Sequence, residues 1–248
     1  MWSIKIAALA IAAIASTLVS AESGCNPLKS GTNVCKPNIA CPEKLYVDFT
    51  KETSLPANWT ISNYANVTFG SHGAEFTFRK RGDAPQIWTN CYILYGKVDV
   101  VMQVAPGVGM ISSSVLMSDD GDEIDWEWSG NDFGQTNING KVQTNYFGKG
   151  VTGNYDRATF VTVAYPQSQF HTYTVDWNNQ TTTWYTDGVN RRQLWAQDCK
   201  TSDKQYPQTP AKLQIGIWDG GDQDTNQGTV QWAGGYTCLL YTSPSPRD

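Results

Sequence analysis

The sequence has few of the residues that build transition-metal and nucleic-acid sites. It contains only two histidines, His72 and His171, and no Cys-x-x-Cys or His-Glu-x-x-His motif. We therefore expect no zinc site and no cofactor. Lys and Arg number 18 against 23 Asp and Glu, a formal net charge of −5. This balance argues against nucleic acid as a partner, because binding to phosphates requires clustered positive charge.

Long apolar stretches are missing except at the N-terminus. Lys5 precedes an apolar run over 6–19, and Val-Ser-Ala follows at 19–21. The run is short for a membrane span, and small residues before position 22 suit cleavage, so residues 1–21 are predicted to be a secretory signal peptide rather than an anchor. We expect a secreted, extracellular protein with no transmembrane segment.

Further features agree with secretion. Acceptor sequences for N-linked glycosylation occur at Asn58, Asn66 and Asn179. The six cysteines stand at positions 25, 35, 41, 91, 199 and 238, and an oxidising compartment favours their pairing. Six cysteines allow many connectivities. The one bridge that we predict joins Cys25 to Cys35, because these two bracket a loop rich in Pro, Gly and Asn.

Helical periodicity is also missing. No segment after residue 21 keeps a 3.6-residue apolar period, and short strand-like runs alternate with Gly, Pro, Asn and Asp clusters instead. The predicted strands cover 75–79, 96–103, 112–117, 123–128, 141–147, 171–177, 181–186, 212–217 and 228–232. Many short strands with such turns predict an all-β fold, a sandwich of two antiparallel sheets or jelly roll, over one domain at 22–237.

The last stretch, 238–248, reads CLLYTSPSPRD and lacks the strand pattern that precedes it. We interpret it as foreign sequence from a truncated transcript or a cloning adaptor, with a genuine disordered tail as the alternative, and we leave it out of the fold prediction. If the tail is foreign, Cys238 is foreign as well, and one of the other five cysteines lacks its partner.

The segment 121–128, Gly-Asp-Glu-Ile-Asp-Trp-Glu-Trp, alternates acidic and apolar residues. On a strand this pattern places Glu123, Asp125 and Glu127 on one face and the apolar side chains on the other. Three carboxylates without a base between them repel one another. Retaining glycoside chemistry uses such groups at a separation of about 5–5.5 Å. Positions i and i+4 of a straight strand lie about 13 Å apart, so bent side chains on a concave sheet would have to close the gap. A solvated acidic face and a calcium site remain open as alternatives.

The surrounding sequence resembles glycoside hydrolase family 16. It is most similar to the fungal Crh-type cell-wall transglycosylases, which join chitin to β-glucan, and more distantly to plant xyloglucan endotransglycosylases. The resemblance spans roughly 45–236 and is carried by the segments 122–127, 142–150, 170–177, 186–188, 217–222 and 228–235.

The resemblance implies a jelly roll with a concave substrate cleft. It also implies roles for three residues: Glu123 as nucleophile, Asp125 as assisting carboxylate and Glu127 as general acid/base. The Glu-x-Asp-x-Glu spacing lacks the extra residue of some laminarinases, which favours the transglycosylase and lichenase side of the family. We expect chitin as donor and β-glucan or chitin as acceptor. The alternatives are a β-1,3(4)-glucan hydrolase, a non-catalytic lectin-like module and a structural wall protein.

The neighbouring segments supply candidates for substrate binding. Gln143 and Asn145 share one face of the next predicted strand and are expected to bind sugar hydroxyls. Tyr146 has the opposite parity and falls on the core side. Trp218, beside two glycines, is a candidate stacking platform, with a core position as the alternative.

Three further candidates lie beyond these strands. Tyr155 and Arg157 follow a glycine-containing stretch and are expected to contact the donor chain. For Arg157 a structural salt bridge with Asp156 or another carboxylate is the equal alternative. His171 resembles a family position near the cleft floor, and a buried, hydrogen-bonded histidine is its alternative.

The chain departs from the family pattern at its end. The family continues past residue 235 into further strands, which the foreign-looking tail replaces here, so an unpaired sheet edge is expected. A C-terminal lipid-anchor signal would lie in the same region, and secreted and wall-anchored forms both stay open. We expect a monomer whose partners are cell-wall polysaccharides.

Overall fold

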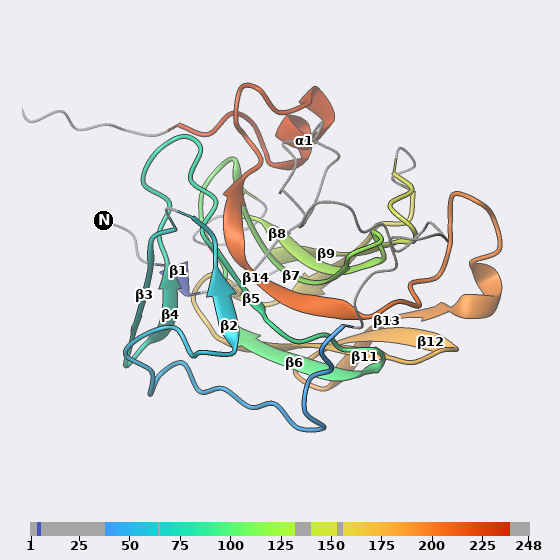
Figure 1. Ribbon diagram of the computed structural model, residues 1–248. Helices are drawn as coiled ribbons and strands as arrows, with labels where there is room; N and C mark the ends of the chain where they lie inside the picture. Colours follow the sequence, from blue (N-terminus) through green and yellow to red (C-terminus); the bar gives the residue numbers. More distant parts are fainter. Residues whose placement is uncertain (1–3, 6–37, 64, 132–139, 153–155, 239–248) are drawn as a thin grey trace, which may run out of the picture.

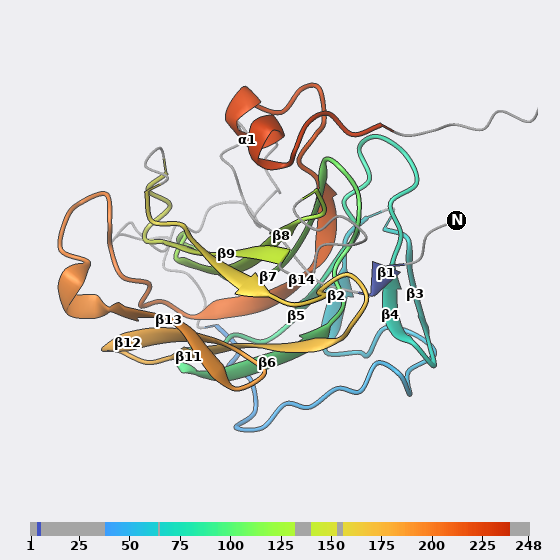
Figure 2. The same cartoon turned by 180° about the vertical axis from the view of Figure 1, so that it is seen from behind.

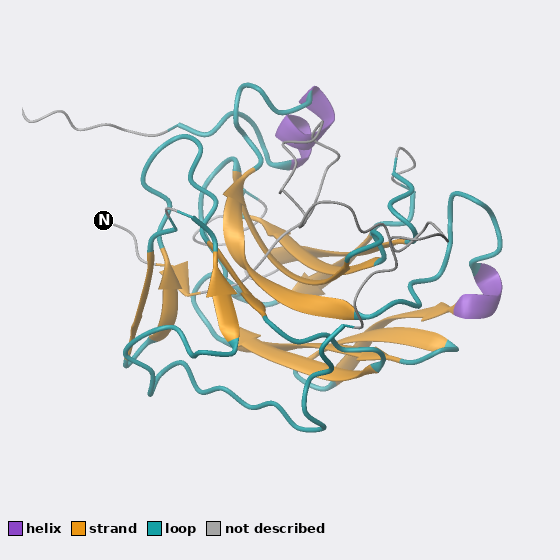
Figure 3. Ribbon diagram, in the orientation of Figure 1, coloured by secondary structure: helices purple, strands orange, loops and turns teal. Residues whose placement is uncertain are grey.

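The computed structural model describes residues 4–5, 38–63, 65–131, 140–152 and 156–238, and almost all regular elements in this part of the chain are β-strands (Figure 1). The strands are β1 (Ile4–Lys5), β2 (Trp59–Ile61), β3 (Val67–Gly70), β4 (Gly73–Phe76), β5 (Gln86–Thr89), β6 (Gly96–Met102), β7 (Met110–Ser118), β8 (Glu123–Ser129), β9 (Gly140–Phe147), β10 (Thr159–Val163), β11 (His171–Trp177), β12 (Thr181–Thr186), β13 (Val189–Trp195) and β14 (Ala211–Asp219). A 3₁₀ turn, Ala196–Asp198, and one short helix, α1 (Gln227–Trp232), complete the described elements (Figure 3).

Two antiparallel sheets form the body of the molecule. One has seven strands in the order β10-β9-β8-β7-β14-β5-β2, and the other has four in the order β13-β12-β11-β6. They are stacked face to face, and the small sheet β1-β4-β3 stands beside them (Figures 1 and 2). The predicted antiparallel sandwich is therefore confirmed. In the four-stranded sheet, β6 has no partner on its outer side among the described residues.

The apolar face of β8 supplies the centre of the core. Trp126 and Trp128 are almost fully buried, and the ring of Tyr173 on the opposing sheet lies 5.4 Å and 4.6 Å from them. Two indole N–H groups tie the sheets together: Trp126 donates to the carbonyl of Thr174 at 3.1 Å, and Trp184 donates to the carbonyl of Asp125 at 2.9 Å. Large rings with satisfied N–H groups hold β8 rigidly against the second sheet.

Most predicted strands are confirmed. Those at 171–177 and 181–186 match β11 and β12 in full, and five others agree within two residues at each end. The segment 75–79 only overlaps β4, which ends at Phe76. Six strands were missed, namely β1, β2, β3, β5, β10 and β13. The first five are at most five residues long, which is too short to show a period, and β13 is largely exposed and lacks a clear alternation of buried and exposed side chains.

The predicted strand at 228–232 is wrong, because the segment forms helix α1. Its Thr, Val and Trp favour a strand when the segment is considered alone. Asn226 decides the outcome: its side chain accepts a hydrogen bond from the main-chain N–H of Thr229 at 3.0 Å and caps the helix. One and a half turns are too short to show a helical period in the sequence.

The described part of the chain contains one disulfide, which joins Cys41 to Cys91 across 50 residues. Cys199 and Cys238 are free. Cys25 and Cys35 lie outside the described residues, so their bridge stays a prediction, as does cleavage after residue 21. No described helix is long and apolar enough to cross a membrane. Of the three glycosylation acceptors, Asn58 and Asn179 are exposed and Asn66 is half-buried.

Candidate active site

The three carboxylates of β8 lie together on the face that points away from the core; we call it the carboxylate face. The residues that alternate with them along the strand, Ile124, Trp126 and Trp128, point into the core, so the predicted alternation is confirmed. The register of β8 with β7 and β9 runs without a shift, so no bulge displaces Glu127. The residues paired directly with the carboxylates are Met117, Val115 and Ser113 on β7 and Phe147, Asn145 and Gln143 on β9.

All three carboxylates are withdrawn from solvent. The exposed fraction is 5% for Glu123, 0% for Asp125 and 1% for Glu127. Gln143 donates its side-chain N–H to Glu127 Oε2 at 3.1 Å, and Asn145 lies opposite Asp125. Gln143 and Asn145 thus share the carboxylate face, as their parity predicts. Burial at this level makes ionisation costly for each acid unless partners offset it.

The electrostatics of Asp125 and Glu127 follow from that burial. Desolvation raises the pKa of Asp125 well above its usual range, and the charges of Glu123 and Glu127 raise it further. Burial and the charge of Glu123 likewise raise the pKa of Glu127 well above its usual range, while the bond from Gln143 opposes this. A carboxyl that keeps its proton towards neutral pH can serve as a general acid.

Asp125 lacks hydrogen-bond donors around its side chain. No N–H or hydroxyl group of the described residues reaches either side-chain oxygen of Asp125. No hydrogen bond from such a donor offsets the cost of burying a negative charge there, which agrees with the raised pKa of this acid.

Trp218 lies on the carboxylate face as well. On β14, Gly216 pairs with Ser113 of β7, and Ser113 pairs with Glu127, so these three residues form one row across the sheet. Trp218 is two residues further along β14, where it pairs with Ile111, and therefore points to the same side as this row. Only 7% of Trp218 is exposed. Ala233 and Trp232 pack against it, with the two indole rings 6.2 Å apart. Segment 227–233 covers the ring, so stacking of a sugar on Trp218 stays a prediction.

Arg157 is buried against Phe147, a residue of the same face. Its guanidinium lies 4.3 Å from the centre of the Phe147 ring and donates to the carbonyls of Val151 and Asp203 at 3.1 Å and 2.6 Å. Asp156 pairs with Lys204. Arg157 thus supports Phe147, the residue opposite Glu123. Tyr155 lies outside the described residues, so its contact with the donor stays a prediction.

His171 is not on the carboxylate face, and the expected position near the cleft floor is wrong. It shares the core side of β11 with Tyr173, whose ring lies 6.1 Å away and packs on Trp128. Its Nδ1 lies 2.7 Å from Asp187 Oδ2. The alternation of β11 places His171 behind β8, where it is the buried, hydrogen-bonded histidine of the alternative interpretation.

Sequence reasoning missed the role of Asp122, which precedes Glu123 and is 1% exposed. Its carboxylate accepts hydrogen bonds from the main-chain N–H of Lys149 at 2.8 Å, from that of Gln208 at 2.7 Å and from the hydroxyl of Thr209 at 2.7 Å. Lys149 Nζ adds an ion pair at 3.5 Å. Asp122 thereby ties the start of β8 to two loops. Its partners come from distant parts of the chain, so no local pattern shows them.

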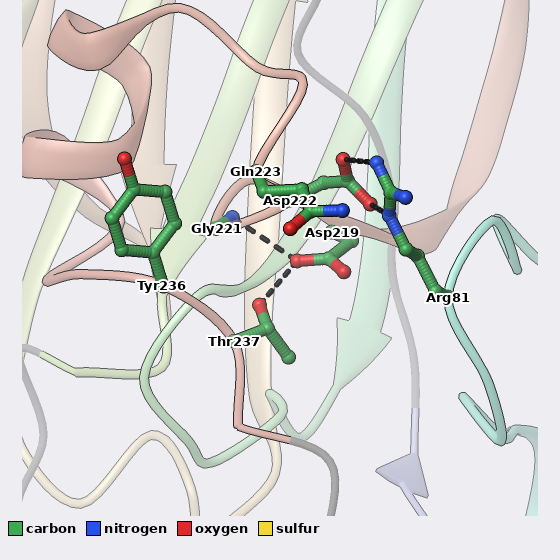
Figure 4. Close-up of a pocket in the computed structure, with 7 residues that line it drawn as sticks. All are labelled: Arg81, Asp219, Gly221, Asp222, Gln223, Tyr236 and Thr237. Atoms are coloured by element: carbon green, nitrogen blue, oxygen red, sulfur yellow. Dashed lines mark hydrogen bonds and ion pairs between the residues drawn. The ribbon is translucent and has the colours of Figure 1, made fainter.

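A cavity of about 580 Å³ lies where β14 ends, and none of the three carboxylates of β8 lines it (Figure 4). Arg81 forms one wall and holds Asp222 through two bonds of 2.6 Å and 2.8 Å. The other lining residues are Asp219, Gly221, Gln223, Tyr236 and Thr237. No group of three or more His, Cys, Asp or Glu is arranged to hold a metal among the described residues.

The chain is similar to proteins of known family. The family model of glycosyl hydrolases family 16 matches residues 55–234. Crh-like protein 5 of Aspergillus fumigatus is 48% identical over 236 residues, which is 94% of this chain and 56% of that protein. Congo red hypersensitive protein 1 of Saccharomyces cerevisiae is 43% identical over 215 residues, 86% of this chain and 39% of that protein. The chain thus spans about half the length of these relatives.

Solved structures agree with this relationship. The Crh5 transglycosylase in complex with NAG is 46% identical with a TM-score of 0.76, covering 86% of this chain and 83% of that one. A Bacillus licheniformis β-glucanase is 26% identical with a TM-score of 0.60, covering 75% and 88%. Together with the all-β sandwich and its acidic central strand, these matches show that the chain belongs to glycosyl hydrolase family 16.

Proposed function

We propose that this protein is a retaining transglycosylase of the cell wall, which cleaves a β-1,4-linked chitin donor and transfers it to β-glucan or chitin. The observation that carries the proposal is the row Glu123, Asp125 and Glu127, which lies buried on one face of β8. A row of buried like charges is costly and has no structural use on a sheet. The similarity to a Crh5 transglycosylase supports transfer over hydrolysis.

The first half of the reaction breaks the donor chain. Glu123, as carboxylate, attacks the anomeric carbon of the donor sugar while protonated Glu127 gives its proton to the glycosidic oxygen. The carbon–oxygen bond breaks, the leaving sugar departs as an alcohol, and an ester joins the donor to Glu123. The raised pKa of Glu127 supplies the proton that this step needs.

The second half of the reaction forms the new bond. Glu127, now a carboxylate, takes a proton from a hydroxyl of the acceptor sugar, whose oxygen attacks the anomeric carbon. The ester to Glu123 breaks, and Glu123 returns as a carboxylate. Two inversions at one carbon retain the β configuration. Water in place of the acceptor gives hydrolysis, the alternative that the likeness to a β-glucanase favours.

Asp125 serves both halves. In its protonated form Asp125 donates a hydrogen bond to Glu123 in this proposal and holds that side chain in one orientation, and its raised pKa favours this form. The charge of Glu123 favours the protonated form of Glu127. Gln143 and Asn145, on the neighbouring strand, bind sugar hydroxyls in this proposal, and Gln143 in addition orients Glu127. Tyr155 remains a proposed contact of the saccharide. We also propose that Trp218 and Arg157 contribute to saccharide binding through the side chains that they support.

The proposed setting is the cell wall outside the plasma membrane. The signal-like N-terminus, the disulfide between Cys41 and Cys91 and the accessible acceptor residues Asn58 and Asn179 support secretion. The protein acts as a monomer on chitin and β-glucan in this proposal. Lipid anchoring of a longer form agrees with the same setting.

A transfer assay tests the function. The full chain is incubated with a chito-oligosaccharide donor and a fluorescent β-1,3-glucan oligomer, and the products are separated by size, with Glu123→Gln as the inactive control. A labelled product longer than the acceptor supports transglycosylation. A shortened donor without labelled product supports the hydrolase. Saccharide binding without any change of either sugar supports the lectin-like alternative and contradicts the proposal.

A further inference from the structure

Phe160 is an exposed aromatic residue on the carboxylate face. It lies on the edge strand β10, where Val161 and Val163 point into the core. Since side chains alternate along a strand, Phe160 points to the opposite side, the side of Glu127. Half of Phe160 is exposed, 50% by area. The neighbouring side chains on this face of the sheet therefore leave the Phe160 ring partly exposed.

The register of the sheet places Phe160 in the same row as Glu127. Phe160 pairs with Gln143, and Gln143 pairs with Glu127. Directly opposed side chains have Cβ atoms about 5 Å apart, so the phenyl ring lies beside the amide that holds Glu127. Two strand spacings, about 10 Å, separate β10 from β8. That distance exceeds a single sugar ring and is within the span of a short oligosaccharide.

The chemistry of this row suits a sugar chain. Glu127 can exchange a proton with a glycosidic oxygen, Gln143 can bind a hydroxyl, and Phe160 offers only a flat apolar surface. A pyranose ring has an apolar face of C–H groups that matches such a surface. A phenylalanine side chain has no polar atom that can form a hydrogen bond with water. An exposed Phe160 therefore lacks the favourable free energy that burial of its ring would contribute.

We propose that Phe160 is a binding residue for a pyranose of the bound polysaccharide, in a subsite on the β10 side of Glu127. The proposal rests on the proposed function, because it requires a saccharide across the carboxylate face. A chain that reaches from Glu127 to β10 contacts the ring, and a shorter one does not. Phe160 therefore makes affinity depend on the length of the saccharide.

Binding measurements on the Glu123→Gln variant of the full chain test this, since that variant holds saccharides without turnover. Chito-oligosaccharides of increasing length are titrated by calorimetry with and without Phe160→Ala. We expect Phe160→Ala to weaken the longer oligosaccharides about three- to tenfold, as loss of an aromatic contact does, and to leave the shortest unchanged. Phe160→Trp restores the affinity for the longer ones.

Phe170 provides a matched control. It is also a phenylalanine, 45% exposed, and it precedes β11 of the other sheet. Phe170→Ala should leave the affinity unchanged at every length. Equal affinities for Phe160→Ala and its parent at every length would overturn the inference and leave the proposed function standing. If the Glu123→Gln parent binds no oligosaccharide at all, the proposed function fails and the inference fails with it.

Discussion

Two aspartates three residues apart, Asp122 and Asp125, show two uses of a buried carboxyl. Both are at most 1% exposed. Asp122 accepts three hydrogen bonds from N–H and hydroxyl donors and faces Lys149. Asp125 receives no such bond from the described residues and faces two glutamates instead. Burial is the same for both, and the partners differ.

The different partners indicate different roles: Asp122 supports the structure, and Asp125 belongs to the proposed chemistry. The bonds to Asp122 offset the cost of burying its charge and join the start of β8 to the loops at Lys149 and Gln208. Asp125 lacks such compensation, so its proton is held rather than lost, and its pKa is raised. We infer that the unfavourable burial of Asp125 persists because its surroundings are stable. Hydrogen-bonded neighbours such as Asp122 and the tryptophans beneath β8 provide that stability.

Substitution of the two glutamates should have the largest effect. Glu123→Gln removes the nucleophile and should lower the transfer rate below detection, while Glu127→Gln removes the proton donor and should lower it by about 10²- to 10⁴-fold. Initial rates in the transfer assay measure both. The melting temperature should stay the same or rise, because a buried charge is lost. Glu123→Gln activity within tenfold of the parent would sink the nucleophile assignment.

Substitution of Asp122 should affect stability instead. Asp122→Ala leaves the main-chain N–H groups of Lys149 and Gln208 without their acceptor, so we expect a loss of about 3–5 kcal/mol in the free energy of unfolding. Denaturant titration measures it. Asp198, an exposed aspartate on the 3₁₀ turn, is the matched control, and Asp198→Ala should change stability by at most about 0.5 kcal/mol. A similar small change for Asp122→Ala would contradict the supporting role.

The sequence predicts β8 well and its surroundings less well. Alternation alone identifies the carboxylate face, because Ile124, Trp126 and Trp128 have only one buried side to occupy. The partners of Asp122 could not be predicted, since they lie 27 and 86 residues away in the sequence. The cover over Trp218 comes from segment 227–233, within which residues 228–232 were predicted as a strand. Phe160 was missed because five residues of β10 show too little alternation.

The dependence of stability on pH gives the smallest and most specific test. In the unfolded chain the carboxyls of Asp125 and Glu127 have pKa values near 3.8 and 4.5, and folding raises both. Above about pH 4 the folded state therefore binds more protons than the unfolded state, and this pair makes stability fall as pH rises towards the raised pKa values. Asp125→Asn removes one of the two raised groups, so the free energy of unfolding should fall less steeply between pH 4 and pH 8 than in the parent. The gain at neutral pH should be about 1 kcal/mol, typical of relieving strain at an active site. Parallel curves for Asp125→Asn and the parent would mean that Asp125 loses its proton at its ordinary pKa and does not share it with Glu123.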